Sequence, residues 1–225
     1  EGQVTASIKA DLVVDSATFT KGGLSAALIP ELRRQPGVAA VSGWRPGAVY
    51  VGAPLWRAGG LDGASMFKVL NLDVEGTTPS SFGVNDVVVS KTLADDQHLK
   101  VGQQVPVGFQ NGIVMHATVR AIFRSQLNVL LGDVLIDSTV MATNLPQSVD
   151  VLAFVDLTKN APATARRDIT ALSARYGGAN VLKPSQLVSK RAELLRGFGR
   201  VIQWMLAFSI ILALIGVANT LQLGV

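Results

Sequence analysis

Several polar residues have the chemical types that enzymes use, and their spacing decides which chemistry is open to them. His98 and His116 are the two histidines of the chain. A metal site built on both would need a carboxylate beside each, and Asp95 and Asp96 lie near only His98. Neighbouring helical residues point in different directions, so the two aspartates do not form an acid–base pair. We expect His98 at an exposed helix end, His116 on an exposed strand face, and no metal site.

Two further patterns approach catalytic motifs without completing them. Ser90–Lys91 places a hydroxyl next to an amine, but neighbouring strand residues face opposite sides of a sheet, and no oxyanion donor can be named. The glycines at positions 59, 60 and 63 do not form the Gly-x-x-x-x-Gly-Lys loop that cradles phosphates. The chain has no cysteine, which excludes disulfides and thiolate chemistry. The sequence therefore predicts no catalytic or cofactor-binding residue and no ATP site.

The charge of the chain is confined to its first part. The protein has 225 residues and a net charge of +4, and every charged residue lies within residues 1–200. No basic run is interleaved with aromatic residues, so we expect no nucleic-acid partner. Cations near the uncharged end favour contact with anionic lipid headgroups: Lys183, Lys190, Arg191, Arg196 and Arg200.

The uncharged end, residues 201–225, organises the rest of the chain. A transmembrane helix needs ~20 mostly apolar residues, so this run is long enough to span a membrane. Trp204 lies one turn into it, where an indole suits the headgroup boundary. Small residues recur on one helical face and predict close packing against other membrane helices: Ser209, Ala213, Gly216, Thr220 and Gly224. The alternative is a buried helix of a soluble protein. Because the chain stops inside the run, we expect it to be part of a larger membrane protein.

A helical stalk is expected just before this run, over residues 185–200, with Ser185 as its cap. Gly197 and Gly199 weaken the helix by ~1 kcal/mol each relative to alanine and predict a soft joint. The stalk would meet the membrane at a boundary formed by these glycines and their neighbours: Arg191, Arg196, Gly197, Gly199, Arg200 and Trp204.

Two strand–helix–strand units are predicted in the preceding 184 residues. The first has a strand over residues 4–15, a helix capped by Ser25, and a strand over residues 38–51 that is interrupted at Gly43, Pro46 and Gly47. The second has a strand over 149–157, a helix over 161–176 and a strand over 180–183. The joints LRRQPGVAAVSG and LSARYGGANVLK correspond to each other. We predict an α+β fold in which these units form a split β-α-β sandwich.

A small β-rich module is predicted between the two units. Its elements are a loop over residues 52–63, helices over 64–72 and 91–99, strands over 86–90 and 134–140, and a hairpin of strands 105–109 and 113–123. Trp44, Trp56 and the loop over 52–63 are the candidate surface for a partner, and the alternative is that both tryptophans pack on the sheet.

The domain division that follows has five parts. Residues 1–52 and 148–184 form the two halves of the sandwich, and residues 53–147 form the inserted β-rich subdomain with its linkers. Residues 185–200 form the stalk helix, and residues 201–225 form the transmembrane helix.

Three of these segments together resemble the extracytoplasmic core domain and following membrane helix of MacB-like and FtsX-like ABC transporter permeases. They are LSAALIPELRRQPGVAAVSG at 24–43, DVVVSKTLADDQHLKVGQQVPVGFQNG at 86–112 with its Leu-x-Val-Gly-x-x-Val run, and GVANTLQLGV at 216–225. The resemblance implies that the sandwich is the family's porter-like subdomain, with a transmembrane helix before residue 1 and further helices after residue 225. It also implies a separate cytoplasmic ATPase, a dimer of permeases that is homo- or heteromeric, and an extracytoplasmic domain that transmits motion.

Two main functions follow from these expectations. The first is a permease subunit in a bacterial cell membrane, with residues 1–200 outside, which passes ATP-driven motion to an envelope substrate. The second is a membrane-anchored sensor or binding module that recruits an envelope partner such as a cell-wall hydrolase. A membrane-bound hydrolase is a third, less favoured hypothesis because no catalytic site is found. One feature opposes the orientation with residues 1–200 outside the cell. Positive residues favour the cytoplasmic side of a membrane helix, yet this orientation places Arg191, Arg196 and Arg200 on the external side.

Overall fold

The computed structural model describes residues 7–16, 22–75, 78–79, 82–125, 127–177, 179–187, 189–190, 202–210 and 212–213. It divides into two compact units, Glu1–Ser185 and Gln186–Val225. The first unit contains helices and a nine-stranded sheet in the order β3-β7-β4-β6-β5-β2-β8-β1-β9. The predicted α+β class is confirmed.

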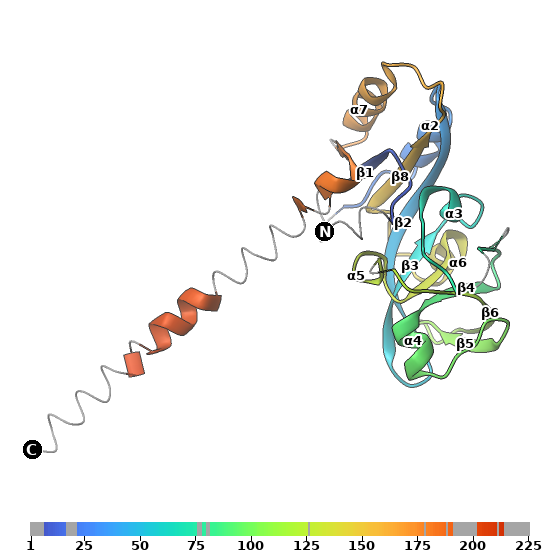
Figure 1. Ribbon diagram of the computed structural model, residues 1–225, viewed down its shortest axis with the longest axis vertical. Helices are drawn as coiled ribbons and strands as arrows, with labels where there is room; N and C mark the ends of the chain where they lie inside the picture. Colours follow the sequence, from blue (N-terminus) through green and yellow to red (C-terminus); the bar gives the residue numbers. More distant parts are fainter. Residues whose placement is uncertain are drawn as a thin grey trace, which may run out of the picture. The chain divides into compact units, whose positions relative to one another are not determined.

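The long strand β2 (Val38–Val51) runs through both halves of the first unit (Figure 1). Up to Trp44 it pairs antiparallel with β8 (Leu152–Leu157), and from Trp44 to Tyr50 it pairs with β3 (Leu55–Leu61). The predicted interruption at Gly43, Pro46 and Gly47 is wrong. Residues 45–49 have a strand neighbour on one side only, so Pro46 occupies an edge position, where its missing N–H is tolerated.

One half of the unit is a helix-covered sheet, which we call the sandwich. Its strands follow the order β2-β8-β1-β9, with β1 at Leu12–Asp15 and β9 at Asn180–Leu182. Helices α2 (Leu28–Arg33) and α7 (Ala165–Arg175) pack over one face. The core between them is formed by apolar residues of all these elements: Leu12, Val14, Leu24, Leu28, Ile29, Leu32, Val41, Ala153, Val155, Ile169 and Leu172.

The two helices form for different reasons. In α7 the buried residues Ala165, Ile169 and Leu172 recur at helical spacing, and Asp168 and Arg175 complement the dipole at its two ends. Helix α2 begins after Ala27, which makes no side-chain cap, so the predicted cap by Ser25 is wrong. Its Pro30 lies in the first turn, where a missing N–H costs no helical hydrogen bond.

The opposite face of the sandwich sheet is also covered. Pairing of Val13 with Phe154, and of Phe154 with Ser42, places all three side chains on that face, and each is fully buried. Helix α3 (Met66–Val69) packs against β2 and β8, and its Val69 carbonyl accepts hydrogen bonds from the amides of residues 9 and 10. The segment after β3 therefore returns to the sandwich before the chain enters β4.

The other half closes into a barrel. The strand pairings run β2-β3-β7-β4-β6-β5 and return to β2 through Tyr50–Gly108 and Val51–Val107. The strands not yet given are β4 (Asp86–Ser90), β5 (Gln104–Gly108), β6 (Val114–Phe123) and β7 (Val134–Asp137). Apolar side chains fill the interior, among them Val49, Val51, Val87, Val89, Val107, Ala117, Val119, Val134 and Ile136.

Several predicted elements of this half are confirmed and others are wrong. The strand and helix at 86–99 are β4 and α4 (Lys91–Asp96), and β5 with β6 forms the predicted hairpin. The predicted loop over 52–63 is instead mostly β3. The predicted strand over 134–140 ends at Asp137, whose side chain caps the unpredicted helix α6 (Ser138–Asn144) by accepting the Thr139 amide at 2.9 Å. Helix α5 (Asn128–Leu131) was not predicted either.

The remaining predictions fall at the two ends of the chain. In the first unit, the predicted strand over 4–15 is reduced to β1, and residues 1–6 lie outside the described residues. In the second unit, residues 202–210 and 212–213 are helical, and most of the predicted stalk and membrane helix is not described. Among the helices that the structure describes, none combines the length and the apolar character needed to cross a membrane. The five-part domain division stays a prediction.

Gly59 is a test of the close packing where β2 meets β3. A Cβ atom there would lie 2.3 Å from the carbonyl oxygen of Leu131 and 2.5 Å from Trp44 Nε1. We expect Gly59→Ala to lower the free energy of unfolding by about 1–3 kcal/mol, because neither neighbour can give way easily. Gly83→Ala is the control, since its nearest atom would lie 3.5 Å away. Equal urea midpoints for both variants would contradict the packing argument.

Candidate functional site

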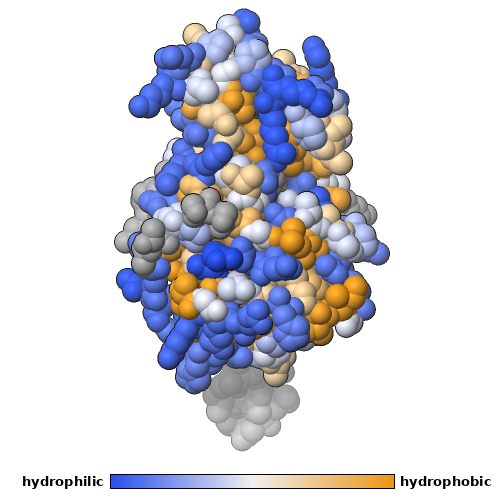
Figure 2. All heavy atoms as spheres, turned by 90° about the vertical axis from the view of Figure 1, so that its right-hand side faces the viewer, coloured by the Kyte–Doolittle hydropathy of each residue, from blue (hydrophilic) through white to orange (hydrophobic). Residues whose placement is uncertain are grey.

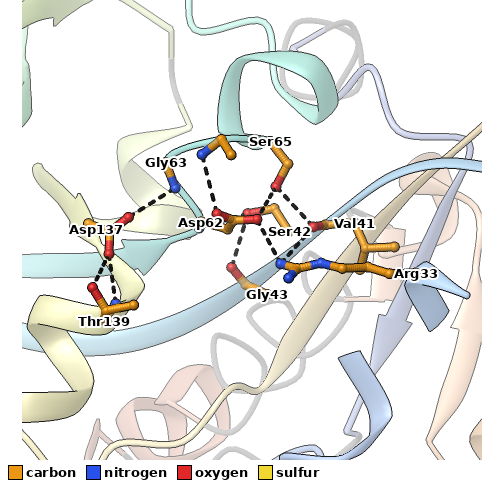
Figure 3. A network of polar contacts seen from close by, with 10 residues as sticks. Arg33, Val41, Ser42, Gly43, Asp62, Gly63, Ser65, Asp137 and Thr139 are labelled. Carbon is orange, nitrogen blue, oxygen red and sulfur yellow. Dashed lines mark hydrogen bonds and ion pairs between the residues drawn. The ribbon is translucent and has the colours of Figure 1, made fainter. Parts of the chain in front are cut away.

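A polar network connects α2, β2, β3 and α3 at the place where the chain leaves β3 (Figure 3). Asp62 lies at its centre. Its Oδ2 accepts a hydrogen bond from Arg33 Nη2 at 2.7 Å and lies 2.9 Å from Ser65 Oγ, and its Oδ1 accepts the Ala64 amide at 3.2 Å. The Asp62 amide donates to Ser42 Oγ at 3.1 Å. One aspartate therefore joins three separate segments of the chain.

The main chain of β2 takes part in the same network. The carbonyl oxygen of Val41 lies 2.9 Å from Ser65 Oγ and 3.4 Å from Arg33 Nη2. Ser42 is fully buried and Ser65 is 7% exposed, so their hydroxyls would be costly to leave unpaired. Next to them, Gly63 donates its amide to Asp137 Oδ2 at 3.1 Å, which connects the loop after β3 to the start of α6.

A surface pocket opens beside this network. It has a volume of about 310 Å³ and lies along the start of β2, where no second strand pairs with residues 38–43. Its wall is formed by α2, β2 and α3 with the loop before it: Arg33, Val38, Ala39, Ala40, Val41, Asp62, Ala64, Ser65 and Lys68. The hydroxyl and carboxylate groups in it are bound to protein partners, so the network holds the pocket wall in place.

The residues considered for catalysis have structural roles or exposed positions. Ser90 Oγ donates to Asp133 Oδ1 at 2.8 Å and accepts the Leu93 amide at 3.2 Å, so Ser90 is the cap of α4. Lys91 pairs with Asp95 one helical turn on. His98 at the end of α4 and His116 on β6 are both exposed, as predicted. Within the described residues, no three histidine or acidic side chains are grouped to hold a metal ion.

The two tryptophans predicted as a partner loop lie on strands. Trp44, on β2, is 5% exposed and its Nε1 donates to the carbonyl oxygen of Leu131 at 3.2 Å. Trp56, on β3, is partly buried and packs against the barrel core. Of the two alternatives, packing of both tryptophans on the sheet is therefore the one observed. The Gly-rich sequence that predicted a loop serves close strand packing at Gly59 and Gly60.

The predicted membrane-boundary and helix-packing residues are mostly not described. Trp204, Ser209 and Ala213 belong to the helical stretches of the second unit, where Trp204 is 66% exposed and Ser209 Oγ donates to the Met205 carbonyl at 2.9 Å. The others lie outside the described residues: Arg191, Arg196, Gly197, Gly199, Arg200, Gly216, Thr220 and Gly224. Their roles stay predictions.

An exposed row of apolar side chains crosses the outside of the barrel. Leu55 pairs with Tyr50, Tyr50 pairs with Gly108, and Gly108 pairs with Val114. Directly paired residues share one face of a sheet. Tyr50, Leu55 and Val114 are 42%, 49% and 58% exposed, and the adjoining Ile113 is 52% exposed. Sequence reasoning missed this row, because only the strand register brings these residues together.

The sequence over most of this chain matches a known family. The model of the MacB-like periplasmic core domain matches residues 1–172. The chain belongs to this family. No curated protein matches the chain. Among solved structures, the periplasmic region of MacB from Actinobacillus actinomycetemcomitans is similar with a TM-score of 0.60 and 13% identity, over 82% of this chain and 92% of that one.

A second solved structure shows the same fold. It is the extracellular domain of the noncanonic ABC-type transporter YknZ from Gram-positive bacteria, with a TM-score of 0.54 and 13% identity over 77% of this chain and 98% of that one. The predicted resemblance to MacB-like core domains is therefore confirmed.

Asp156 of this MacB-like domain lies near the end of β8, an inner strand of the sandwich sheet, and its carboxyl group has a raised pKa. Burial raises the pKa of Asp156 on β8, the nearby carboxylate of Asp11 raises it further, and Lys9 opposes the rise. Asp11 is itself held by the Leu157 amide, which donates to its Oδ2 at 2.8 Å. The folded protein therefore binds a proton at Asp156 more tightly than the unfolded chain does.

Replacement of Asp156 by asparagine gives a pH-dependent test. A raised folded pKa means that Asp156 favours the folded state only when it is protonated, and this contribution is lost as pH rises through the folded pKa. Asp156→Asn keeps the neutral form, so we expect a higher melting temperature at pH 7 and a gain that shrinks as pH falls through the raised folded pKa and is lost below about pH 4, the ordinary range of a carboxyl group. Asp96→Asn, at an exposed site on α4, is the control. A gain that is constant from pH 7 to pH 3 would contradict the assignment.

Proposed function

We propose that this chain is the extracytoplasmic part of a permease subunit of an ABC transporter, together with the first part of a membrane helix. Its task is to pass ATP-driven motion outward to an envelope substrate. Membership of the MacB-like periplasmic core domain family supports the proposal, as do the solved relatives, which are named as parts of MacB and of the ABC-type transporter YknZ.

The observation that carries the proposal is the continuity of β2. This strand belongs to the sandwich core through Val41 and to the barrel core through Val49 and Val51, without a loop between them. A displacement of the sandwich would therefore be transmitted to the barrel through a hydrogen-bonded strand rather than through a flexible linker. Such a body is suited to transmitting motion.

The second unit supplies the proposed connection to the membrane. Residues 201–225 contain no charge, and the large apolar side chains of its described helical residues are exposed: Ile202, Trp204, Met205, Leu206, Phe208, Ile210 and Leu212. We propose that they contact lipid and that the small face with Ser209 and Ala213 packs against further membrane helices. Arg191, Arg196 and Arg200 would then meet headgroups at the boundary, with Gly197 and Gly199 as a joint.

The proposal includes partners and excludes an enzymatic role for this chain. A separate cytoplasmic ATPase would hydrolyse ATP, and a second permease copy, identical or related, would complete the transporter. Ser90, which attracts attention in the sequence as a nucleophile, is already bound as a donor to Asp133 and an acceptor from Leu93. We propose that ATP hydrolysis lies in the partner, and no cofactor is assigned to this chain.

A binding role for the barrel is favoured by the exposed apolar row. Single exposed apolar residues are ordinary, but Tyr50, Leu55 and Val114 align across four strands with Gly108 among them. On the face drawn in Figure 2, apolar patches are separate and surrounded by hydrophilic residues. We propose that the row contacts an envelope protein, either as the target of the transmitted motion or, in the alternative function, as a recruited partner.

The transmission proposal is tested in the full-length protein by inserting a flexible Gly-Ser segment next to Gly197. We expect the variant to fold, insert in the membrane and co-purify with an ATPase encoded with it, but to lose transport, because a flexible joint dissipates the motion. The same insertion between Lys159 and Asn160, in an exposed turn of the sandwich, is the control and should keep transport. Unchanged transport after insertion at Gly197, or no bound ATPase in the parent protein, would refute the proposal.

The binding proposal is tested by charged substitutions in the apolar row. We expect Leu55→Asp and Val114→Asp to abolish recovery of the partner protein in a pull-down from envelope extracts, with unchanged melting temperatures because both side chains are about half exposed. Val84→Asp, 51% exposed in the segment just before β4 and outside the row, is the matched control and should keep the partner. Equal recovery with all three variants would show that the row is not the contact.

A further inference from the structure

The exchange of strand partners on β2 takes place at two consecutive residues, Trp44 and Arg45. Trp44 is the last residue of β2 that pairs with β8 and the first that pairs with β3. Consecutive strand residues face opposite sides of a sheet. The two side chains therefore leave β2 in opposite directions at the place where the sandwich and the barrel join.

Arg45 is bound to the sandwich side. Its Nη2 lies 3.1 Å from Asp150 Oδ2 and its Nε lies 3.5 Å from Oδ1, and the two side chains are only 17% and 13% exposed. Bidentate arginine–carboxylate pairs have a more defined geometry than surface ion pairs with a single contact. The carbonyl oxygen of Asp150 also accepts the amide of Leu24 at 2.6 Å, which connects the pair to the segment leading into α2.

Trp44 is bound to the barrel side. Its indole N–H donates to the carbonyl oxygen of Leu131, just before β7, and the indole lies against Gly59 of β3. On the other face, the small residue Gly43 makes room for the ion pair, since a Cβ there would lie 3.0 Å from Asp150 Oδ1 and 2.5 Å from Ile29 Cδ1. Gly43 thus leaves space for the Arg45–Asp150 ion pair on one face of β2, and Gly59 leaves space for the Trp44 indole on the other face.

These contacts act where β2 is least supported. Immediately after Trp44, residues 45–49 pair with β3 alone among the described strands. The other side of β2 therefore has no strand hydrogen bonds there that would resist bending. The side chain of Ser148 adds a hydrogen bond to the Pro46 carbonyl from the segment that returns to the sandwich. Restraint against bending therefore comes from side chains and from the returning segment.

We propose that Trp44 and the Arg45–Asp150 pair form a rigid junction that fixes the angle between the sandwich and the barrel. The first unit then moves as one body, and motion arriving at the sandwich reaches the barrel undiminished. The purpose of this motion rests on the proposed function, whereas the rigidity of the junction does not.

The test measures the distance between the two halves in the full-length protein. The sequence shown contains no cysteine, so Thr170→Cys on α7 and His116→Cys on β6, both exposed, provide spin-label sites within it. Any cysteine in the rest of the full-length chain is first replaced by serine. We expect a narrow distance distribution by double electron–electron resonance, which Arg45→Met broadens by several ångströms while transport falls severalfold. Arg34→Met is the matched control, because its exposed pair with Glu31 lies at the end of α2 and does not reach the barrel, and it should leave both readouts unchanged.

Two further variants keep the result decisive. The double variant Arg45→Asp with Asp150→Arg exchanges the charges, and its distance distribution should be narrower than that of Arg45→Met. If Arg45→Met does not fold, Asp150→Asn is used in its place. A broad distribution in the parent, or a narrow one after loss of the pair, would overturn the rigid junction even if the parent transports. A narrow parent distribution that broadens as expected, in a protein that binds no ATPase and transports nothing, would support the junction and refute the proposed function.

Discussion

One strand has to serve two hydrophobic cores, and the architecture of the first unit depends on how β2 does this. Val41, Val49 and Val51 are separated by even numbers of residues and therefore leave β2 on the same face. Along that face, Val41 packs in the core of the sandwich, and Val49 and Val51 pack in the core of the barrel. Between them β2 has glycines at 43 and 47, where an added Cβ would lie 2.5 Å from Ile29 Cδ1 and 2.4 Å from Met141 Cε. A larger residue at either position would therefore require a side chain of the sandwich core or of the barrel core to move.

Polar groups then specify the arrangement that the apolar cores allow. Buried hydroxyls and carboxylates are costly unless paired, so a network that satisfies all its members disfavours any packing that breaks it. Asp62 meets this condition through contacts with Arg33, Ser65 and Ala64. Asp137 meets it through the amides of Gly63 and Thr139. These contacts position the loop after β3 relative to α2 and α6, which hydrophobic packing alone would leave adjustable.

Sequence patterns predict the elements whose signals are local and miss those that depend on distant neighbours. The helix α7 and the hairpin of β5 and β6 are predictable because apolar periodicity and a turn-forming Asn-Gly mark them. The strand β3 is not, because its Gly59 and Gly60 read as loop residues until Leu131 and Met141 are seen against them. In the same way Asp62 and Asp137 look like ordinary polar residues. A serine that directly follows an apolar run, Ser42 after residues 38–41, is a local signal that could indicate such a network.

Closure of the barrel also affects how the protein behaves at high concentration. Exposed strand edges are templates for aggregation, and closure of strands into a ring removes most of them. Among the described strands, β3, β4, β5, β6 and β7 each have two neighbours, and the sheet ends at β9, which has only three residues. The partly unpaired stretch of β2 carries Pro46, a residue that cannot donate to an incoming strand. The fold therefore leaves few strand edges that could pair with another molecule at high protein concentration.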